Sequence, residues 1–257
     1  MLNTVGSYTF TIDAYLSDFR GKATLPMIGG FLLQAASKHA EERGFGYSVM
    51  TERGKAWVLS RMYIQICEYP TNETQISVNT WVTDINKLFT ERCFSIEDKN
   101  GREIGFARSL WAALDVETRR PTNILDLGEL TGYICKKTCP IEPISKIGQP
   151  KEEAKLRSEF TVQYSDIDIN KHLNSMKYIE HFVDVFPIQM YHDKEIRDFN
   201  VNYLLEGHYG EKLQVLETGI EPDVFTLTMK NAEKAICLAK VGWAQPVGDT
   251  VSLLKTK

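Results

Sequence analysis

The sequence contains no run of 18 apolar residues and no excess of basic residues over its 257 positions. The first absence predicts that no helix spans a membrane. The net charge of −4 argues against a general nucleic-acid-binding protein. Residues 1–10 lack the basic start and long apolar stretch of a secretory signal, and the five cysteines are few and scattered. We therefore expect a cytoplasmic protein with reduced thiols.

Several motifs of common enzymes are also missing. The sequence has no G-x-S-x-G elbow of a serine hydrolase, no P-loop and no dinucleotide fingerprint. Cys135 and Cys139 lie close together, but no second pair with zinc-ligand spacing accompanies them. We expect neither a cofactor nor a metal centre.

A dense polar cluster stands out at residues 164–174, where two aspartates, two asparagines and one histidine share eleven positions. An apolar helical pattern follows at residues 176–186, so the cluster lies at the start of a helix. The cluster opens like a calcium-binding loop, but Lys171 and Lys177 stand where that loop needs glycine and a bidentate glutamate. We exclude calcium and expect catalytic chemistry at the cluster.

The chain repeats one order of elements. Phe10-Thr11-Ile12 and Phe160-Thr161-Val162 each precede a helical pattern, and strand-like runs follow each helix. Thr24 is the expected N-cap of the first helix, and Gly44 is its expected end. The pattern predicts an α+β fold with a half at 1–137, a linker at 138–153 and a half at 154–257. A short helix is expected at 126–134.

A series of short motifs, in order along nearly the whole chain, carries a family resemblance. The series consists of Trp57-Val58-Leu59-Ser60-Arg61-Met62, Tyr69-Pro70, Thr80-Trp81-Val82, Arg108-Ser109-Leu110-Trp111, Arg119-Arg120-Pro121 and the run from Asp166 to Tyr178. The series resembles the acyl-acyl carrier protein thioesterases of plants and bacteria. The resemblance implies a tandem hotdog fold, in which two long helices are each wrapped by an antiparallel β-sheet.

The resemblance also implies four catalytic residues. The aspartate, asparagine and histidine of the family motif fall on Asp168, Asn170 and His172, and the glutamate falls on Glu206 within Tyr203-Leu204-Leu205-Glu206-Gly207. Two positions depart from the family: Ser175 replaces an asparagine, and Gly207 replaces a cysteine of the plant members. If this chain is active, that cysteine is not required.

The residue types suit thioester hydrolysis. Asp168, Asn170 and His172 are two apart, so an extended segment points all three to one side. Asn170 and His172 can donate hydrogen bonds, and a helix N-terminus favours a polarised carbonyl. Glu206 is the candidate base for water, while direct attack by Asp168 through an anhydride stays open.

Other polar residues near the cluster have simpler roles. We expect Asp166 to turn the backbone and Asn174 or Ser175 to cap the helix. His208 is a candidate for supporting the site, next to Glu206.

The first half has lost part of the cluster. At an offset of 150, Asp18, Arg20 and Lys22 stand in place of Asp168, Asn170 and His172. We therefore expect the first half to be non-catalytic and, as in the family, to line the acyl-chain pocket. Trp57, Trp81 and Trp111 are candidate substrate-binding residues there, although core packing is the favoured role for any one of them.

The function implied by the resemblance is hydrolysis of fatty acyl-acyl carrier protein to free fatty acid, which ends chain elongation. The alternatives are an acyl-CoA thioesterase, a non-catalytic acyl-binding protein and, by fold analogy alone, a 3-hydroxyacyl dehydratase. Because the carrier protein is acidic, we expect a local basic patch, with Arg119, Arg120, Lys136 and Lys137 as candidates. A homodimer stays open.

Overall fold

The computed structural model describes residues 4–128, 130–148 and 154–247. Ten strands form one antiparallel sheet within these residues, in the order β1-β3-β4-β5-β2-β7-β10-β9-β8-β6. The strands are β1 Val5–Thr11, β2 Lys55–Ile66, β3 Gln75–Ile85, β4 Thr90–Asp98, β5 Glu103–Asp115, β6 Lys155–Thr161, β7 Glu195–Tyr203, β8 Lys212–Glu221, β9 Val224–Lys230 and β10 Ala235–Ala244. The helices are α1 Leu25–Glu41, α2 Tyr47–Glu52, α3 Ser175–Val183 and α4 Ile188–Asp193.

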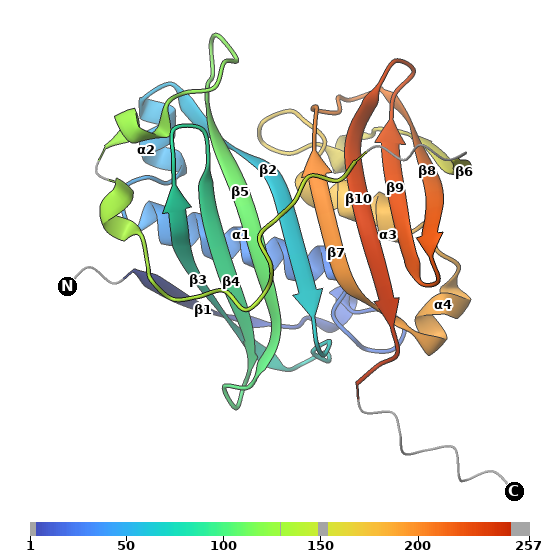
Figure 1. The fold of residues 1–257 in the computed structure, drawn as a ribbon. Helices are drawn as coiled ribbons and strands as arrows, with labels where there is room; N and C mark the ends of the chain where they lie inside the picture. Colours follow the sequence, from blue (N-terminus) through green and yellow to red (C-terminus); the bar gives the residue numbers. More distant parts are fainter. Residues whose placement is uncertain (1–3, 129, 149–153, 248–257) are drawn as a thin grey trace, which may run out of the picture.

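The two halves join where β2 pairs with β7, so both contribute to one continuous sheet. Helices α1 and α3 lie behind the same face of this sheet and contact each other (Figure 1). The α+β arrangement predicted from the sequence is therefore confirmed. Among the described residues, no helix is both long and apolar enough to cross a membrane.

Helix α1 begins and ends where the sequence predicts. The Thr24 hydroxyl accepts a hydrogen bond from the Met27 N–H at 3.3 Å. Pro26 occupies the first turn, where its missing N–H costs nothing. Gly44 follows the helix with φ +73°, the left-handed conformation that glycine adopts without strain. The apolar side of α1 packs on the sheet.

Helix α3 is shorter than its apolar pattern suggests. Asn174 caps it by accepting a hydrogen bond from the Met176 N–H at 2.8 Å, as predicted. The pattern extends to Phe186, but the helix ends at Val183. Phe186 precedes Pro187, and a residue before proline is disfavoured in helical conformation because of steric clash. The chain therefore breaks before α4.

The internal repeat is confirmed by matching hydrogen bonds. Strands β1 and β6 start 150 residues apart, as do α1 and α3. The Asp18 N–H donates to the Lys22 carbonyl at 2.8 Å, and the Asp168 N–H donates to the His172 carbonyl at 2.9 Å. Both loops therefore close in the same way before their helices.

The segment that follows β5 crosses the face of the sheet opposite to the helices (Figure 1). The Arg108 guanidinium holds this segment by donating to the carbonyls of Ile141 at 2.8 Å and Cys139 at 3.3 Å. Two short 3₁₀ helices, Ile124–Leu127 and Leu130–Tyr133, replace the single helix predicted at 126–134. The half boundaries and the linker at 138–153 stay predictions, and residues 149–153 lie outside the described ranges.

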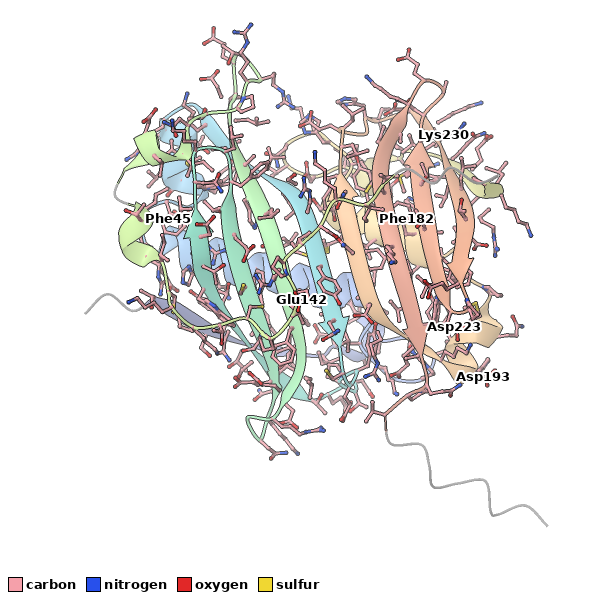
Figure 2. The ribbon with its side chains drawn as sticks, in the orientation of Figure 1. Phe45, Glu142, Phe182, Asp193, Asp223 and Lys230 are labelled. Carbon is pink, nitrogen blue, oxygen red and sulfur yellow. The ribbon has the colours of Figure 1, made fainter. Side chains whose placement is uncertain are left out.

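The buried side chains form two clusters. The larger one runs through both halves and includes Phe182 of α3, which is fully buried between helix and sheet (Figure 2). The smaller one lies in the first half and includes Phe45, labelled in Figure 2. Met50 belongs to the same cluster. Burial of this apolar area is the main stabilising contribution to the fold.

Candidate active site

Glu206 and His172 meet although 34 positions separate them in the sequence. The His172 Nε2 atom lies 3.2 Å from the Glu206 Oε2 atom, and the Arg119 guanidinium forms an ion pair with the same oxygen. The Leu173 N–H donates to the Gly207 carbonyl at 2.8 Å, which ties the loop before α3 to the segment after β7. The backbone therefore fixes where the two side chains meet.

All four predicted catalytic residues line one cavity of about 730 Å³. Asp168, Asn170, His172 and Glu206 come from the second half. The first half contributes apolar walls to this cavity, including Trp57 and Trp111. The sequence prediction had placed Asp168, Asn170 and His172 on one segment and Glu206 on another, and both segments line this cavity.

Trp81 lies elsewhere. Its indole is fully buried and donates to the Lys137 carbonyl at 2.9 Å, on the face of the sheet that the crossing segment covers. The preceding residue, Thr80, faces α1, because its hydroxyl accepts from Arg92 beneath that helix. Successive strand residues point to opposite faces, so Trp81 points away from the helices. Of the three tryptophans proposed from the sequence, Trp57 and Trp111 line the cavity and Trp81 does not.

Asp168 organises the loop that carries Asn170 and His172. One oxygen of its carboxylate accepts from the Asn170 N–H at 2.8 Å and from the His172 N–H at 3.3 Å. Lys171, inside this turn, adopts a left-handed conformation with φ +65°. A carboxylate used in this way is a structural element of the turn.

Asn170 and Ser175, which can both donate hydrogen bonds, line the cavity. The Asn170 side chain lines both this cavity and a second one described below. Ser175, the first residue of α3, also lines the cavity, at the positive end of the helix dipole. An oxyanion placed here would find donors from the amide and the helix end.

Tyr178 positions Glu206, a role that the sequence did not reveal. Its hydroxyl donates to the Leu205 carbonyl at 3.2 Å and accepts from the Gly207 N–H at 2.8 Å. Burial raises the pKa of Tyr178, so the hydroxyl stays protonated. A Cβ atom at position 207 would lie 3.2 Å from both this hydroxyl and the Leu173 side chain, which is a tight contact. The only sequence signal was the place of Tyr178 at the end of the family motif.

We expect Tyr178→Phe to lower kcat about tenfold and to destabilise the protein by about 1 to 2 kcal/mol, because the Gly207 N–H would lose its partner in a buried site. Steady-state kinetics and urea unfolding measure the two effects. Tyr191→Phe is the control, since Tyr191 makes a comparable buried hydrogen bond to the Val183 carbonyl outside this cavity. Equal kcat losses in both variants would contradict a positioning role.

The first half contains a modified copy of the site. The Ala23 N–H donates to the Pro70 carbonyl at 2.9 Å, just as the equivalent Leu173 N–H donates to the Gly207 carbonyl. Pro70 therefore corresponds to Gly207, and the preceding residue, Tyr69, corresponds to Glu206. The Tyr69 hydroxyl donates to the Ile196 carbonyl at 2.7 Å. The copy therefore lacks the carboxylate that Glu206 supplies, as well as the amide of Asn170 and the imidazole of His172. The sequence alignment of the two halves had revealed only the loss of the amide and the imidazole.

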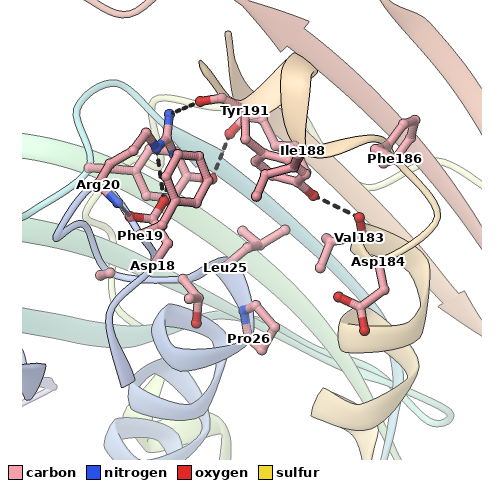
Figure 3. A pocket seen from close by; sticks show the side chains of 14 residues that line it. Asp18, Phe19, Arg20, Leu25, Pro26, Val183, Asp184, Phe186, Ile188 and Tyr191 are labelled. Carbon is pink, nitrogen blue, oxygen red and sulfur yellow. Dashed lines mark hydrogen bonds and ion pairs between the residues drawn. The ribbon is translucent and has the colours of Figure 1, made fainter. Parts of the chain in front are cut away.

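Arg20 and Lys22 of this copy bind the other half of the protein. Arg20 donates to the Asp18 carboxylate and to the Tyr191 carbonyl, as Figure 3 shows. The Lys22 ammonium donates to Glu195 at 2.6 Å. A cavity of about 300 Å³ remains there, and its wall includes Asp18, Arg20 and Tyr69.

The remaining polar predictions can be placed as well. The Asp166 carboxylate accepts from the Gln163 N–H at 2.8 Å, so it turns the backbone as expected. The His208 ring lies edge-on to the His172 ring with centroids 5.3 Å apart. Of the candidate basic patch, Arg119 pairs with Glu206, and the Lys137 ammonium lies 4.3 Å from the Trp81 ring centroid.

Comparisons with known proteins agree with this geometry. The model of the acyl-ACP thioesterase N-terminal domain matches residues 4–129, and that of the C-terminal domain matches residues 149–251. The chain belongs to the acyl-ACP thioesterase family. A crystal structure of an acyl-ACP thioesterase from Bacteroides thetaiotaomicron is 39% identical, with a TM-score of 0.89, over 94% of this chain and 98% of that one. The tandem hotdog fold is thereby confirmed.

More distant relatives come from plants. The structure of a 12:0-ACP thioesterase from Umbellularia californica has a TM-score of 0.83 at 20% identity, over 95% of this chain and 99% of that one, and shares the fold. An acyl-[acyl-carrier-protein] hydrolase of Cuphea viscosissima is 27% identical over 83% of this chain and 54% of its own length. An oleoyl-acyl carrier protein thioesterase of Coriandrum sativum is 26% identical over 86% of this chain and 64% of its own length. The chain thus spans between half and two thirds of the length of the Cuphea and Coriandrum relatives.

Proposed function

We propose that this protein hydrolyses the thioester of fatty acyl-acyl carrier protein and releases free fatty acid. Family membership supports the reaction class. The observation that carries the proposal is the Glu206–His172 pair, 3.2 Å apart in the wall of a cavity with apolar sides. A carboxylate and an imidazole in such a place suit water activation beside an acyl chain.

Glu206 is the proposed base. Its carboxylate takes a proton from a water molecule as that water attacks the thioester carbonyl carbon. His172, in contact with Glu206, orients the carboxylate and delivers the proton to the leaving sulfur. The C–S bond then breaks, so the products are a fatty acid and the free thiol of the carrier's prosthetic arm.

Asn170 and the start of α3 are the proposed oxyanion donors. The negative charge that develops on the carbonyl oxygen is stabilised by hydrogen bonds that are already oriented before the reaction. We assign Asp168 to holding this loop rather than to nucleophilic attack. The support is Asp18 of the first half, whose carboxylate accepts the same pair of backbone bonds, from Arg20 at 2.8 Å and Lys22 at 3.0 Å, in a copy without the other groups.

The acyl chain is proposed to run into the first half, between its helices and the sheet. A second cavity of about 480 Å³ lies there, between α1, α2 and the sheet. It shares Leu33, Trp57, Trp111 and Asn170 with the catalytic cavity. A chain whose thioester lies beside Glu206 can therefore extend past the tryptophans into this second cavity, with apolar contacts along its length.

The acidic carrier protein is the proposed partner, and exposed Arg120 and Lys136 are the basic residues proposed to contact it. A cytoplasmic location is proposed as well, supported by five cysteines that are all free thiols. Sedimentation equilibrium decides whether the chain forms a homodimer.

Release of free thiol from matched acyl-carrier-protein and acyl-CoA substrates tests the proposal, with His172→Ala and Asn170→Ala measured alongside. We expect carrier-protein substrates to turn over faster and both variants to lose about 10²-fold or more in kcat. Faster turnover of CoA substrates would favour an acyl-CoA thioesterase. Full activity in both variants would refute the site, and binding without turnover in the wild type would indicate an acyl-binding protein.

A further inference from the structure

Arg92 is a buried cation with almost no partner. It lies on β4, beneath α1, and only 5% of its surface is exposed. Its guanidinium donates one hydrogen bond, to the Thr80 hydroxyl at 3.2 Å. Within residues 4–128, 130–148 and 154–247, no other side chain accepts from it and no carboxylate forms an ion pair with it. A guanidinium has five N–H groups, so most of its bonding capacity is unused.

The surroundings make this charge more costly. Burial, together with the nearby Arg43 guanidinium, lowers the pKa of Arg92 to about 10, which still leaves it charged at neutral pH. Burial, with Arg92 and Arg43 nearby, lowers the pKa of His39 to about 3, so His39 is neutral and does not add a further positive charge beside Arg92. Buried charges without partners are rare because desolvation opposes them. Arg92 therefore needs an explanation that the fold alone does not supply.

Arg92 lines the second cavity, whose wall is otherwise mainly apolar and includes Phe45, Met50 and Trp57. Thr90 pairs across the sheet with Trp111, and Arg92 pairs with Ser109. Arg92 therefore lies beyond Trp111, one of the two tryptophans that the cavities share. The neighbouring Ser109 hydroxyl accepts from the Trp111 indole at 2.8 Å, and within the described residues Arg92 forms its side-chain hydrogen bond with Thr80 and not with Ser109. The remaining N–H groups of Arg92 can therefore donate to a molecule that occupies the cavity.

We propose that Arg92 is a specificity-determining residue that selects acyl chains carrying an oxygen function, a hydroxyl or a carboxylate, on the part remote from the thioester. This inference rests on the proposed function for the reaction at the other end of the chain. An oxygen acceptor on the chain forms charge-assisted hydrogen bonds with the guanidinium. An unsubstituted alkyl end desolvates the same group and gives nothing in return.

The test compares substrates of equal length that differ only at the remote end. Carrier-protein thioesters of unsubstituted, ω-hydroxy and ω-carboxy acids, each in short, medium and long versions, are hydrolysed by the wild type and by Arg92→Met. We expect the wild type to favour an oxygenated chain at least about tenfold in kcat/KM at one of these lengths. Arg92→Met should abolish or reverse that ratio, and it should not lower thermal stability, because it removes an unpaired buried charge.

Arg108→Met is the matched control. Arg108 is also a largely buried arginine of the same sheet, but it contacts the crossing segment on the opposite face. The Arg108→Met variant should keep the wild-type ratio of kcat/KM between oxygenated and unsubstituted chains. A wild-type protein that prefers unsubstituted chains at every length would overturn the proposal whatever the variants do, and so would an unchanged ratio in folded Arg92→Met.

Binding of the free acids separates this inference from the proposed function. Displacement of a fluorescent fatty acid measures the affinity of each acid without any hydrolysis. Preference for oxygenated acids in a protein that cleaves no thioester would refute the proposed function and keep the role of Arg92. Hydrolysis without any such preference, in either assay, would refute the role of Arg92 alone.

Discussion

Glu206→Gln should lower kcat for thioester hydrolysis by about 10² to 10⁴-fold with little change in KM, because the amide keeps the size of the side chain but cannot accept a proton from water. Steady-state release of free thiol measures the loss. The Arg119 guanidinium and the His172 imidazole both contact this carboxylate, so the variant should also lose the ion pair with Arg119. Circular dichroism should show an unchanged fold.

Glu211→Gln is the control for this variant. Glu211 lies on the same loop, but its carboxylate accepts from the His208 N–H and the Asn231 side chain instead of facing the cavity. We expect its kcat to remain within a factor of about two of wild type, in line with a role in the loop alone. Near-normal activity in Glu206→Gln would show that water is activated elsewhere.

Labelled water distinguishes the two routes that the sequence leaves open. If Glu206 activates water, ¹⁸O enters only the released fatty acid. If Asp168 attacks the thioester and water then opens the anhydride at the Asp168 carbonyl carbon, single-turnover reactions leave ¹⁸O in the Asp168 carboxylate. We expect no label in Asp168, because its Oδ1 atom accepts two backbone hydrogen bonds that hold the loop, as the equivalent atom of Asp18 does in the first half.

Glu195→Gln should destabilise the protein by about 2 kcal/mol, somewhat below the usual cost of breaking a fully buried ion pair, because Lys22 keeps partial access to water. Only 7% of the Glu195 side chain is exposed, and it contacts Lys22 at 2.6 Å and Arg20 at 3.6 Å. These cations belong to the first half and Glu195 belongs to β7. The loss therefore weakens the contact between halves, and urea unfolding measures it.

Two comparisons check the cause of that loss. Glu68→Gln removes a well-exposed pair with Arg102 and should change stability little, since water screens such pairs. The double variant Glu195→Gln with Lys22→Met should be less destabilised than the sum of its single variants. Additive losses would indicate that the two groups do not act as a pair.

The modified copy in the first half gives these two predictions a common basis. Both halves keep the aspartate that closes the loop before the helix, Asp18 in one and Asp168 in the other. In the second half the following positions carry an amide and an imidazole. In the first half they carry cations that reach Glu195 across the interface. The same loop thus supports chemistry in one copy and attachment between halves in the other.

Features with a local cause could be predicted from the sequence. Thr24, Asn174 and Gly44 predicted the helix limits because capping depends on a few adjacent residues. Asp168, Asn170 and His172 could be proposed together because they share one short segment, and Glu206 because it lies in a matching motif. The predicted end of α3 was about one turn too late, because the apolar pattern continues to Phe186 and takes no account of Pro187.

The tertiary structure decided what depends on contacts between distant segments. It placed Arg119 on Glu206, fixed the Glu206 segment with Tyr178, and put Tyr69 at the matching place in the first half. It also placed Trp81 outside the cavity, and it placed Arg92 at the second cavity, where its guanidinium has one hydrogen-bond partner among the described residues. By itself, the sequence determined the α+β class, the repeat and the candidate catalytic residues, because these rest on periodicity, capping and short motifs. The partners of those residues were decided only by the packing of the two halves, because a contact between distant segments has no local signal in the chain.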